Sequence, residues 1–271
     1  PRGCVTGLIL TQNNLVGTLP YSLTSMVALN RLYLNKNKLS GSVPDNFNYL
    51  TALEVLSLGQ NQLSGAIPTS IGNASKLRYI ALESNDLSGV IPVTIGNLAG
   101  LHQLYLQGNN LMGELPSSFW NLVNLKAVNL GQNNLTGILP EAIGNMTELS
   151  YFAISSNDFY NTLPSSLWTL EKLDRLWLDD NSFWCIIPPE IGNLNNLTWL
   201  NLSSNTFWYV LPSEIGSLSK LKKLDASNNY LDGVLPTTLG QLERLEELRL
   251  ENNLFYGIIP KELENLRHLQ Y

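Results

Sequence analysis

The residue types that most often perform catalysis are scarce in this chain and lie far apart. Its two histidines, His102 and His268, are separated by about seven units of the repeating pattern described below, so they cannot share one site. Cys4 and Cys185 are the only cysteines, and the sequence has no phosphate-binding loop and no Cys/His metal spacing. The sequence therefore predicts a protein that is not an enzyme and that needs no cofactor or metal ion.

Side chains suited to recognition are more frequent, because Tyr, Trp and Arg are enriched among the residues that contribute most to binding energy. A first group lies on or beside short segments that have the pattern of strands, at positions expected to face solvent. Strands favour aromatic residues in any case, which is the alternative explanation. The residues predicted to bind a ligand are Tyr33, Tyr79, Tyr105, Tyr151, Arg175, Trp177, Asp179 and Trp199.

The element that positions these residues is a 24-residue repeat without insertion or deletion. Similarity at a fixed period is the signature of a solenoid, in which each unit stacks on its neighbours. One asparagine marks each repeat, and a proline follows seven residues later. These asparagines are Asn13, Asn37, Asn61, Asn85, Asn109, Asn133, Asn157, Asn181, Asn205, Asn229 and Asn253.

One repeat shows how the pattern works. Alternation in its short strand turns Leu32 and Leu34 inward and exposes Tyr33. Asn37 follows where the chain leaves the strand, and its amide can both donate to and accept from the backbone. A single repeat cannot bury its apolar side chains alone, so stacked repeats are expected to share a continuous core.

Three consecutive repeats depart from the pattern at two adjacent positions. The second of these positions is glycine in the other repeats, and the first is often serine or threonine. An exposed aromatic cluster of this kind usually marks an interface, and we expect rings in neighbouring repeats to lie about 5 Å apart, near stacking distance. We call this set the lateral edge: Tyr160, Asn161, Trp184, Cys185, Trp208 and Tyr209.

The lateral edge is predicted to contact a partner, such as a co-receptor or a second copy of the chain. Local repacking of a relaxed repeat, deliberate engineering and sequence error are the alternative explanations. Cys185 has two interpretations as well: a small, half-buried apolar residue, or a cysteine that forms an intermolecular disulfide.

Composition and charge narrow the class of protein. The chain is 44% hydrophobic and 14% charged, with a net charge of −6. A nucleic-acid-binding protein would need a basic stripe, which this sequence lacks. No apolar run approaches the length of a membrane helix, so we expect no membrane segment in this chain.

Five Asn-X-Ser/Thr triplets favour a secreted glycoprotein, although an asparagine-rich repeat also generates such triplets by chance. Asn73 and Asn145 fall on the return side of the repeat and are the best candidates. Asn201 lies on a strand beside Trp177, where a glycan would obstruct ligand binding. The predicted acceptors are Asn73, Asn134, Asn145, Asn196 and Asn201.

The pattern L-x-x-L-x-L-x-x-N-x-L-x-G-x-I/L-P, clear from Leu53 to Pro68, closely resembles the plant-type leucine-rich repeat over residues 5–270. The resemblance implies an α/β repeat solenoid, a right-handed superhelix with a parallel β-sheet on its concave side. It also implies short second strands and 3₁₀ turns on the convex side. The expected domain is a single one, residues 1–271, of about 11 repeats.

The segment from Cys4 to Leu8 looks like the first strand after this family's cysteine-bearing N-terminal cap. Between Pro1 and Tyr271 the N-terminal cap is mostly missing and the C-terminal cap is missing, so we expect a processed chain or a part of something longer. At about 4.8 Å per repeat the two cysteines would lie roughly 34 Å apart, too far for a disulfide. The resemblance instead pairs Cys4 with a cysteine of the missing cap.

The family includes receptor-kinase ectodomains, receptor-like proteins, polygalacturonase inhibitors and an antifreeze protein, so the fold does not decide the function. We predict an extracellular module that recognises a peptide or protein, as the ectodomain of a receptor-like protein or a fragment of one. Some receptor kinases of the family recognise a peptide C-terminus with an Arg-x-Arg pair, and the matching positions here, such as Arg175 and Trp177, lack that pair. A secreted inhibitor of a cell-wall hydrolase is the alternative. A structural or ice-binding role ranks third, because the sequence has no unbroken row of threonines.

Overall fold

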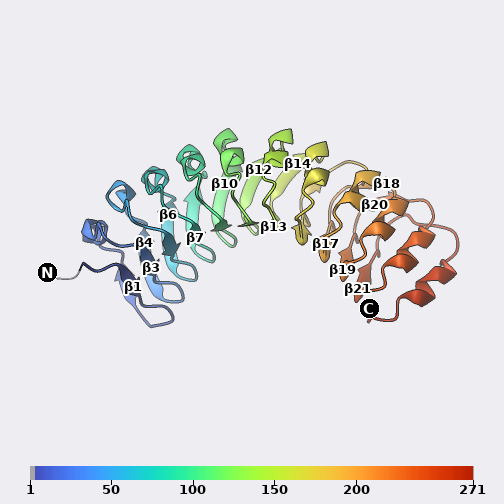
Figure 1. Ribbon diagram of the computed structural model, residues 1–271, viewed down its shortest axis with the longest axis horizontal. Coiled ribbons are helices and arrows are strands. Elements are labelled where there is room, and N and C mark those ends of the chain that lie inside the picture. Colours follow the sequence, from blue (N-terminus) through green and yellow to red (C-terminus); the bar gives the residue numbers. More distant parts are fainter. Residues whose placement is uncertain (1–3, 271) are drawn as a thin grey trace. The chain divides into compact units, whose positions relative to one another are not determined.

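The computed structural model describes residues 4–270, so the outermost ends of the predicted domain, residues 1–3 and 271, lie outside the described part. Contacts divide the chain into two compact units, Pro1–Gly137 and Ile138–Tyr271. Within each unit a repeat runs through a short strand, a turn and a 3₁₀ helix, and most repeats add a second short strand (Figure 1). A single uninterrupted domain stays a prediction.

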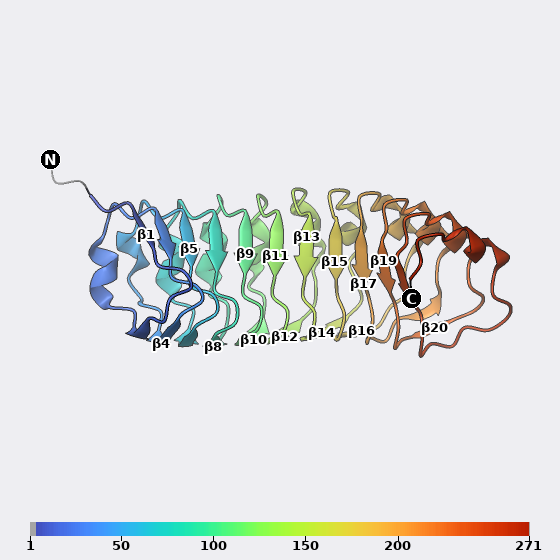
Figure 2. The ribbon, with the colours of Figure 1, turned by 90° about the horizontal axis from the view of Figure 1, so that it is seen from below.

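The main sheet of the first unit is parallel and follows the chain in sequence order (Figure 2). Its register places Leu32 opposite Leu56 and Ser57 opposite Tyr33, so each position of the repeat forms a straight row across the sheet. Its strands are β1 (Gly7–Ile9), β3 (Arg31–Tyr33), β5 (Val55–Ser57), β7 (Tyr79–Ala81), β9 (Gln103–Tyr105) and β11 (Ala127–Asn129).

The second strands of this unit also pair in parallel, but with a different register. Ser40 lies opposite Gln62, two residues before its counterpart Ser64 in the next repeat. The strands are β2 (Val16–Thr18), β4 (Lys38–Ser42), β6 (Gln62–Ala66), β8 (Asp86–Gly89), β10 (Asn110–Glu114) and β12 (Asn134–Gly137). The 3₁₀ helices are η1 (Tyr21–Ser25), η2 (Phe47–Tyr49), η3 (Thr69–Asn73), η4 (Val93–Asn97) and η5 (Ser117–Asn121).

The second unit has the same order of elements, with one interruption. Its main sheet comprises β13 (Tyr151–Ala153), β15 (Arg175–Trp177), β17 (Trp199–Asn201), β19 (Lys223–Asp225) and β21 (Glu247–Arg249). Its 3₁₀ helices are η6 (Glu141–Asn145), η7 (Ser165–Thr169), η8 (Pro189–Asn193), η9 (Ser213–Ser217), η10 (Thr237–Gln241) and η11 (Lys261–Asn265).

The interruption lies in the second strands of this unit. β14 (Asp158–Asn161) pairs with β16 (Ser182–Phe183), and β18 (Trp208–Val210) pairs with β20 (Tyr230–Asp232), but β16 and β18 belong to different sheets. β16 ends after two residues, directly before Trp184 and Cys185. The break therefore falls within the lateral edge.

The core consists of rows of inward-facing side chains that run from repeat to repeat. Leu56, Ile80 and Leu104 of the strand row are fully buried, as are Ile71 and Phe119 of the 3₁₀ row. A proline precedes most of the 3₁₀ helices, where its fixed φ suits the extended residue before the turn and its missing N–H leaves no donor unpaired. The expected continuous core is confirmed within each unit.

The repeated asparagine joins each repeat to the one before it. The Asn205 Oδ1 accepts the backbone N–H of Phe183 at 3.0 Å, and its Nδ2 donates to the carbonyls of Leu178, Leu202 and Ser203 at 3.0, 3.3 and 3.1 Å. Phe183 and Leu178 belong to the preceding repeat. One buried amide thus forms hydrogen bonds with backbone groups of two repeats where the chain turns. Buried backbone groups need such partners.

We expect Asn205→Ala to lower the free energy of unfolding by about 2 to 4 kcal/mol, because it leaves buried backbone groups of two repeats without partners. Urea unfolding followed by circular dichroism measures this loss. Asn195→Ala, which removes an exposed amide of the same unit, should change the value by less than about 0.5 kcal/mol. Equal effects of the two substitutions would contradict this account of the asparagine.

Candidate ligand-binding surfaces

The solvent side of the main sheet in the second unit carries aromatic side chains in mutual contact. The Tyr151 and Trp177 ring centroids lie 5.3 Å apart at 83°, and those of Trp177 and Trp199 lie 4.5 Å apart at 66°. The Lys223 Nζ lies 4.8 Å from the Trp199 ring centroid, within cation–π range. The three aromatic side chains are half-buried, so they are held by their neighbours and still reach solvent.

Polar groups beside these rings offer specific contacts. The Trp177 Nε1 is buried and has no hydrogen-bond acceptor. Burial raises the pKa of the Asp179 carboxyl, and its Oδ1 accepts a hydrogen bond from the Ser155 Oγ at 2.6 Å. Arg175 is exposed, with its Nε 3.4 Å from the Asp174 Oδ2. The surface thus presents an indole donor without a partner and an exposed guanidinium.

Beyond Lys222 the solvent side of this sheet is charged. Lys222 and Lys223 pair with Glu246 and Glu247 of the next repeat, with N–O distances of 2.8 and 3.0 Å. Arg249 also pairs with Glu247, at 2.6 Å. These ion pairs join neighbouring strands, and their side chains are partly exposed, so this part of the sheet is a solvated surface.

In the first unit the structure brings together two of the three predicted tyrosines. The Tyr79 and Tyr105 ring centroids lie 5.8 Å apart. Burial, the Glu83 carboxylate, Tyr105 and Tyr33 together raise the pKa of Tyr79 to about 12. Burial and Glu83 also raise the pKa of Tyr105. Tyr33 on β3 is half-buried and contributes least to the raised pKa of Tyr79.

The residues predicted from the sequence did not include Glu83 and Gln107, which follow these tyrosines along the chain. Both occupy the position two residues before the repeated asparagine, as does Asp179 in the second unit. The Glu83 Oε2 and the Gln107 Oε1 are buried without a hydrogen-bond partner, and burial raises the pKa of the Glu83 carboxyl. The signal was available in the sequence, because this position carries a carboxylate in few repeats and a small residue in several others.

The lateral edge is exposed but is not a stack of rings. Tyr160, Trp184, Trp208 and Tyr209 are between 45% and 55% exposed. The ring contact of this set within residues 4–270 is the one between Trp208 and Tyr209, with centroids 6.1 Å apart. The expected stacking between repeats was wrong, because the second strands pair with a two-residue offset: Tyr160 lies opposite Ser182, not opposite Trp184.

The backbone explains why three residues replace glycine here. Glycines at this position in other repeats have positive φ, for example +75° at Gly41 and +79° at Gly233. Asn161 and Tyr209 keep this left-handed conformation, with φ of 74° and 72°, which is strained for a residue that carries a Cβ. Cys185 has no such φ, and the strand ends before it. The repeat that contains Cys185 thus relieves the strain by changing its path.

Both cysteines are free thiols, and the predicted disulfide of Cys4 stays a prediction. Cys185 is half-buried and lines a cavity of about 330 Å³ with Trp168, Leu163, Ile186 and Pro188 among its other walls. Burial raises the pKa of the Cys185 thiol, which disfavours the thiolate needed for disulfide exchange. The structure therefore favours the interpretation of Cys185 as a small apolar residue.

The five predicted glycosylation sites differ in exposure. Asn73, Asn134, Asn145 and Asn196 are exposed, whereas Asn201 is half-buried. Asn201 lies opposite Trp177 in the sheet, and its Oδ1 accepts a hydrogen bond from the Ser203 Oγ at 2.8 Å. Glycosylation stays a prediction for all five.

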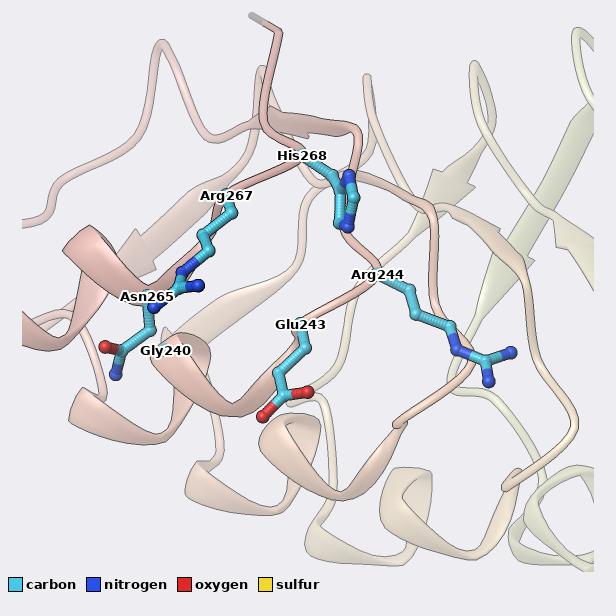
Figure 3. A pocket seen from close by; sticks show the side chains of 6 residues that line it. All are labelled: Gly240, Glu243, Arg244, Asn265, Arg267 and His268. Atoms are coloured by element: carbon cyan, nitrogen blue, oxygen red, sulfur yellow. The ribbon is translucent and has the colours of Figure 1, made fainter.

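A depression of about 660 Å³ is lined by Gly240, Glu243, Arg244, Asn265, Arg267 and His268. Figure 3 shows that its charged side chains do not converge, because Arg244 points away from Glu243 and Arg267. This depression therefore lacks the geometry of a charged-ligand site. Among residues 4–270, no three His, Cys, Asp or Glu side chains gather as metal ligands would, and no helix is long and apolar enough to span a membrane.

Comparisons of the sequence with protein families match almost the whole chain. A leucine-rich repeat region matches residues 59–179, and a leucine rich repeat model matches residues 5–63. A single-repeat model of the same kind matches residues 172–194, 196–218, 220–242 and 244–266. No curated protein sequence matches the chain.

Solved structures are similar over nearly the full length. The plant peptide hormone receptor RGFR1 in complex with RGF2 has 32% identity and a TM-score of 0.89 over 98% of this chain and 46% of that chain. The Arabidopsis receptor kinase HAESA, in complex with the peptide hormone IDA and the co-receptor SERK1, has 30% identity and a TM-score of 0.87 over 98% of this chain and 53% of that chain. A plant ice-binding protein has 26% identity and a TM-score of 0.77 over 93% of this chain and 82% of that chain. The chain spans about half the length of these two receptors.

We expect Tyr209→Gly to be more stable than Tyr209→Ala by about 1 kcal/mol, because only glycine adopts the left-handed conformation without strain. Tyr160 provides the control: it has no positive φ, so Tyr160→Gly should be less stable than Tyr160→Ala. Urea unfolding of the four variants measures both differences. The same order at both positions would mean that Tyr209 is not strained.

Proposed function

We propose that this chain, which belongs to the leucine-rich repeat family, is an extracellular module that recognises a peptide or protein ligand on the solvent side of its main sheet. The observation that carries this proposal is the contact set of Tyr151, Trp177 and Trp199 with Lys223 above the Trp199 ring. Aromatic side chains held by their neighbours and open on one side supply much contact area and lose little conformational entropy on binding.

The indole N–H of Trp177 supports a peptide as the ligand. A buried donor without an acceptor is unfavourable in the free protein. A backbone carbonyl of an extended peptide would satisfy it, while the peptide's side chains pack between the rings. The exposed guanidinium of Arg175 offers an additional contact for a carbonyl or carboxylate of the ligand.

The similar structures support the same class of function. RGFR1 is a peptide hormone receptor, and HAESA was solved with a peptide hormone and a co-receptor. By analogy, this chain would be the ectodomain of a receptor-like protein, or part of one, and would lie outside the cell. Because the chain spans about half the length of these receptors, the activity of a whole receptor is also only proposed.

The lateral edge is proposed as a second contact surface, for a co-receptor or for another copy of this chain. Its rings are exposed, and Tyr209 holds a strained conformation that glycine would adopt freely. Strained backbone persists where surrounding structure enforces it and is frequent at functional sites. The change of path at Cys185 turns this part of the chain away from the regular second strands.

Peptides selected from a random display library on the native protein should bind the double variant Trp177→Ala with Trp199→Ala at least tenfold more weakly, since hot-spot truncations cost about 2 kcal/mol or more. Fluorescence anisotropy of the labelled peptides measures this. The lateral-edge variant Trp184→Ala with Trp208→Ala should bind them as the native protein does. If both double variants bind equally well, the main sheet is not the ligand surface.

The same lateral-edge variant tests the second surface. We expect it to keep the native circular dichroism spectrum, because both tryptophans are about half exposed, and to lose any self-association that sedimentation velocity detects in the native protein. The main-sheet variant should retain that association. Unchanged self-association in the lateral-edge variant would reject the edge as a contact between copies of the chain, and an unfolded variant would identify these rings as core.

A further inference from the structure

Two acceptor oxygens on the main sheet of the first unit lie buried without a hydrogen-bond partner. They are the Glu83 Oε2, just after β7, and the Gln107 Oε1, just after β9. The two residues occupy the same position in successive repeats, and the strands that precede them pair in parallel. Both unsatisfied atoms are acceptors, so the missing partner is a donor.

A glycine makes room for the Glu83 carboxylate. A Cβ added at Gly59, the same position in the preceding repeat, would lie 2.2 Å from the Glu83 Oε1 and 2.4 Å from the Oε2. The φ of Gly59 is not positive, so the residue serves here for space rather than for backbone conformation. The carboxylate therefore lies in a slot that any larger side chain at position 59 would fill.

Aromatic rings stand beside this slot. The Tyr79 and Tyr105 rings contact each other, and the pKa of each hydroxyl is raised in part by the Glu83 carboxylate. The negative charge is thus close to both rings. Tyrosine faces and a carboxylate together form a favourable environment for a cation.

Within the described residues, no lysine or arginine forms an ion pair with this carboxylate. Burial, without a neighbouring positive charge to oppose it, raises the pKa of the Glu83 carboxyl. A half-buried acid in this state favours binding of a positively charged donor, which would satisfy both the charge and the open acceptors.

We propose that the slot formed by Glu83, Gln107, Tyr79 and Tyr105 over Gly59 binds an ammonium or guanidinium group carried by the ligand. This inference rests on the proposed function, because it assigns the cation to a lysine or arginine side chain, or to the N-terminal amine, of the recognised peptide. The Glu83 carboxylate accepts from the cation, the Gln107 Oε1 accepts a second hydrogen bond, and the tyrosine rings enclose the alkyl stem.

The test uses N-acetyl-arginine amide as a probe, with N-acetyl-citrulline amide as its neutral counterpart of nearly equal shape. Titration is followed by the NMR signals of the Gln107 side-chain amide. We expect the arginine probe to bind at least tenfold more tightly than the citrulline probe. N-acetyl-lysine amide and glycinamide as further probes distinguish an ammonium on a side chain from an N-terminal amine.

Three variants locate the effect. Glu83→Gln removes the charge and keeps the shape, and should weaken binding of the arginine probe at least tenfold. Gly59→Ala keeps the charge but displaces the flexible carboxylate from its slot, and should weaken binding as well. Glu251→Gln changes an exposed carboxylate at the same repeat position in the second unit and should leave binding unchanged. Equal binding of both probes, or unchanged affinity in Glu83→Gln, would overturn the proposal and mean that water or a rotated Gln107 amide satisfies these atoms.

The pH dependence gives an independent readout. Affinity for the arginine probe should fall when the pH drops from 7 to 4, since Glu83 becomes protonated. The affinity of Glu83→Gln should not change over this range. Because this variant retains His102, an unchanged affinity would also show that His102 does not cause the pH dependence. The tyrosines do not contribute, because the pKa values of Tyr79 and Tyr105 are raised further above 10.

Stability separates a binding role from a structural one. A carboxyl whose pKa is raised on folding favours the folded state at low pH, and this contribution is lost as the pH rises through the unfolded and then the folded pKa. Glu83→Gln should therefore raise the melting temperature at pH 7 relative to its effect at pH 4. A lowered melting temperature at pH 7 would identify Glu83 as a structural residue. If the arginine probe binds but the display library yields no binding peptide, this inference holds and the proposed function fails. If peptides bind but the arginine probe does not, the proposed function holds and this inference fails.

Discussion

The rest of each unit depends on the hydrogen bonds between the side chain of the repeated asparagine and the backbone. The asparagine amide occupies the turn after the strand, where backbone groups of two successive repeats point inward and away from water. In Asn229 the Oδ1 accepts the Phe207 N–H, and the Nδ2 donates to the Leu202 and Ala226 carbonyls. One type of side chain thus provides hydrogen-bond partners for the backbone groups of the turn and fixes the distance between turns of neighbouring repeats. Because the rows of leucine, isoleucine and phenylalanine behind the turn are held at the same spacing, they bury each other fully.

A fixed spacing also decides what the second strands tolerate. One position in or next to the second strand requires a left-handed residue, and glycine meets this requirement in most repeats. Asn161 and Tyr209 accept the strain, whereas the chain at Cys185 ends its strand and takes another path. Neighbouring repeats therefore meet the same backbone requirement in two ways, by a strained residue or by a strand that ends early. The exposed rings of the lateral edge lie in these repeats.

The constant positions leave the solvent side of the main sheet free to vary, and there the two units differ in chemistry. The first unit presents tyrosines around a carboxylate and an amide whose acceptors lack partners; the second presents tryptophans, an indole donor without a partner, and then a series of ion pairs. Since both peptide hormone receptors and an ice-binding protein share this fold, function depends on these surface groups and not on the repeat that carries them.

The sequence by itself determined a stacked solenoid with continuous buried rows, because one repeat cannot bury its inward leucines without its neighbours. The parallel main sheet, the second strands and the 3₁₀ turns were expected from the resemblance to the leucine-rich repeat. The sequence also identified the rows that face solvent. It did not determine which side chains meet. The lateral rings were expected to stack, but the second strands pair Tyr160 with Ser182, and a two-residue offset cannot be inferred from a period of 24. Glu83 was not predicted because its role depends on the direction of its side chain. The carboxylate reaches back over Gly59 in the preceding repeat, and its Oε2 has no hydrogen-bond partner. Register and side-chain direction depend on contacts between repeats, so only the tertiary structure decided them.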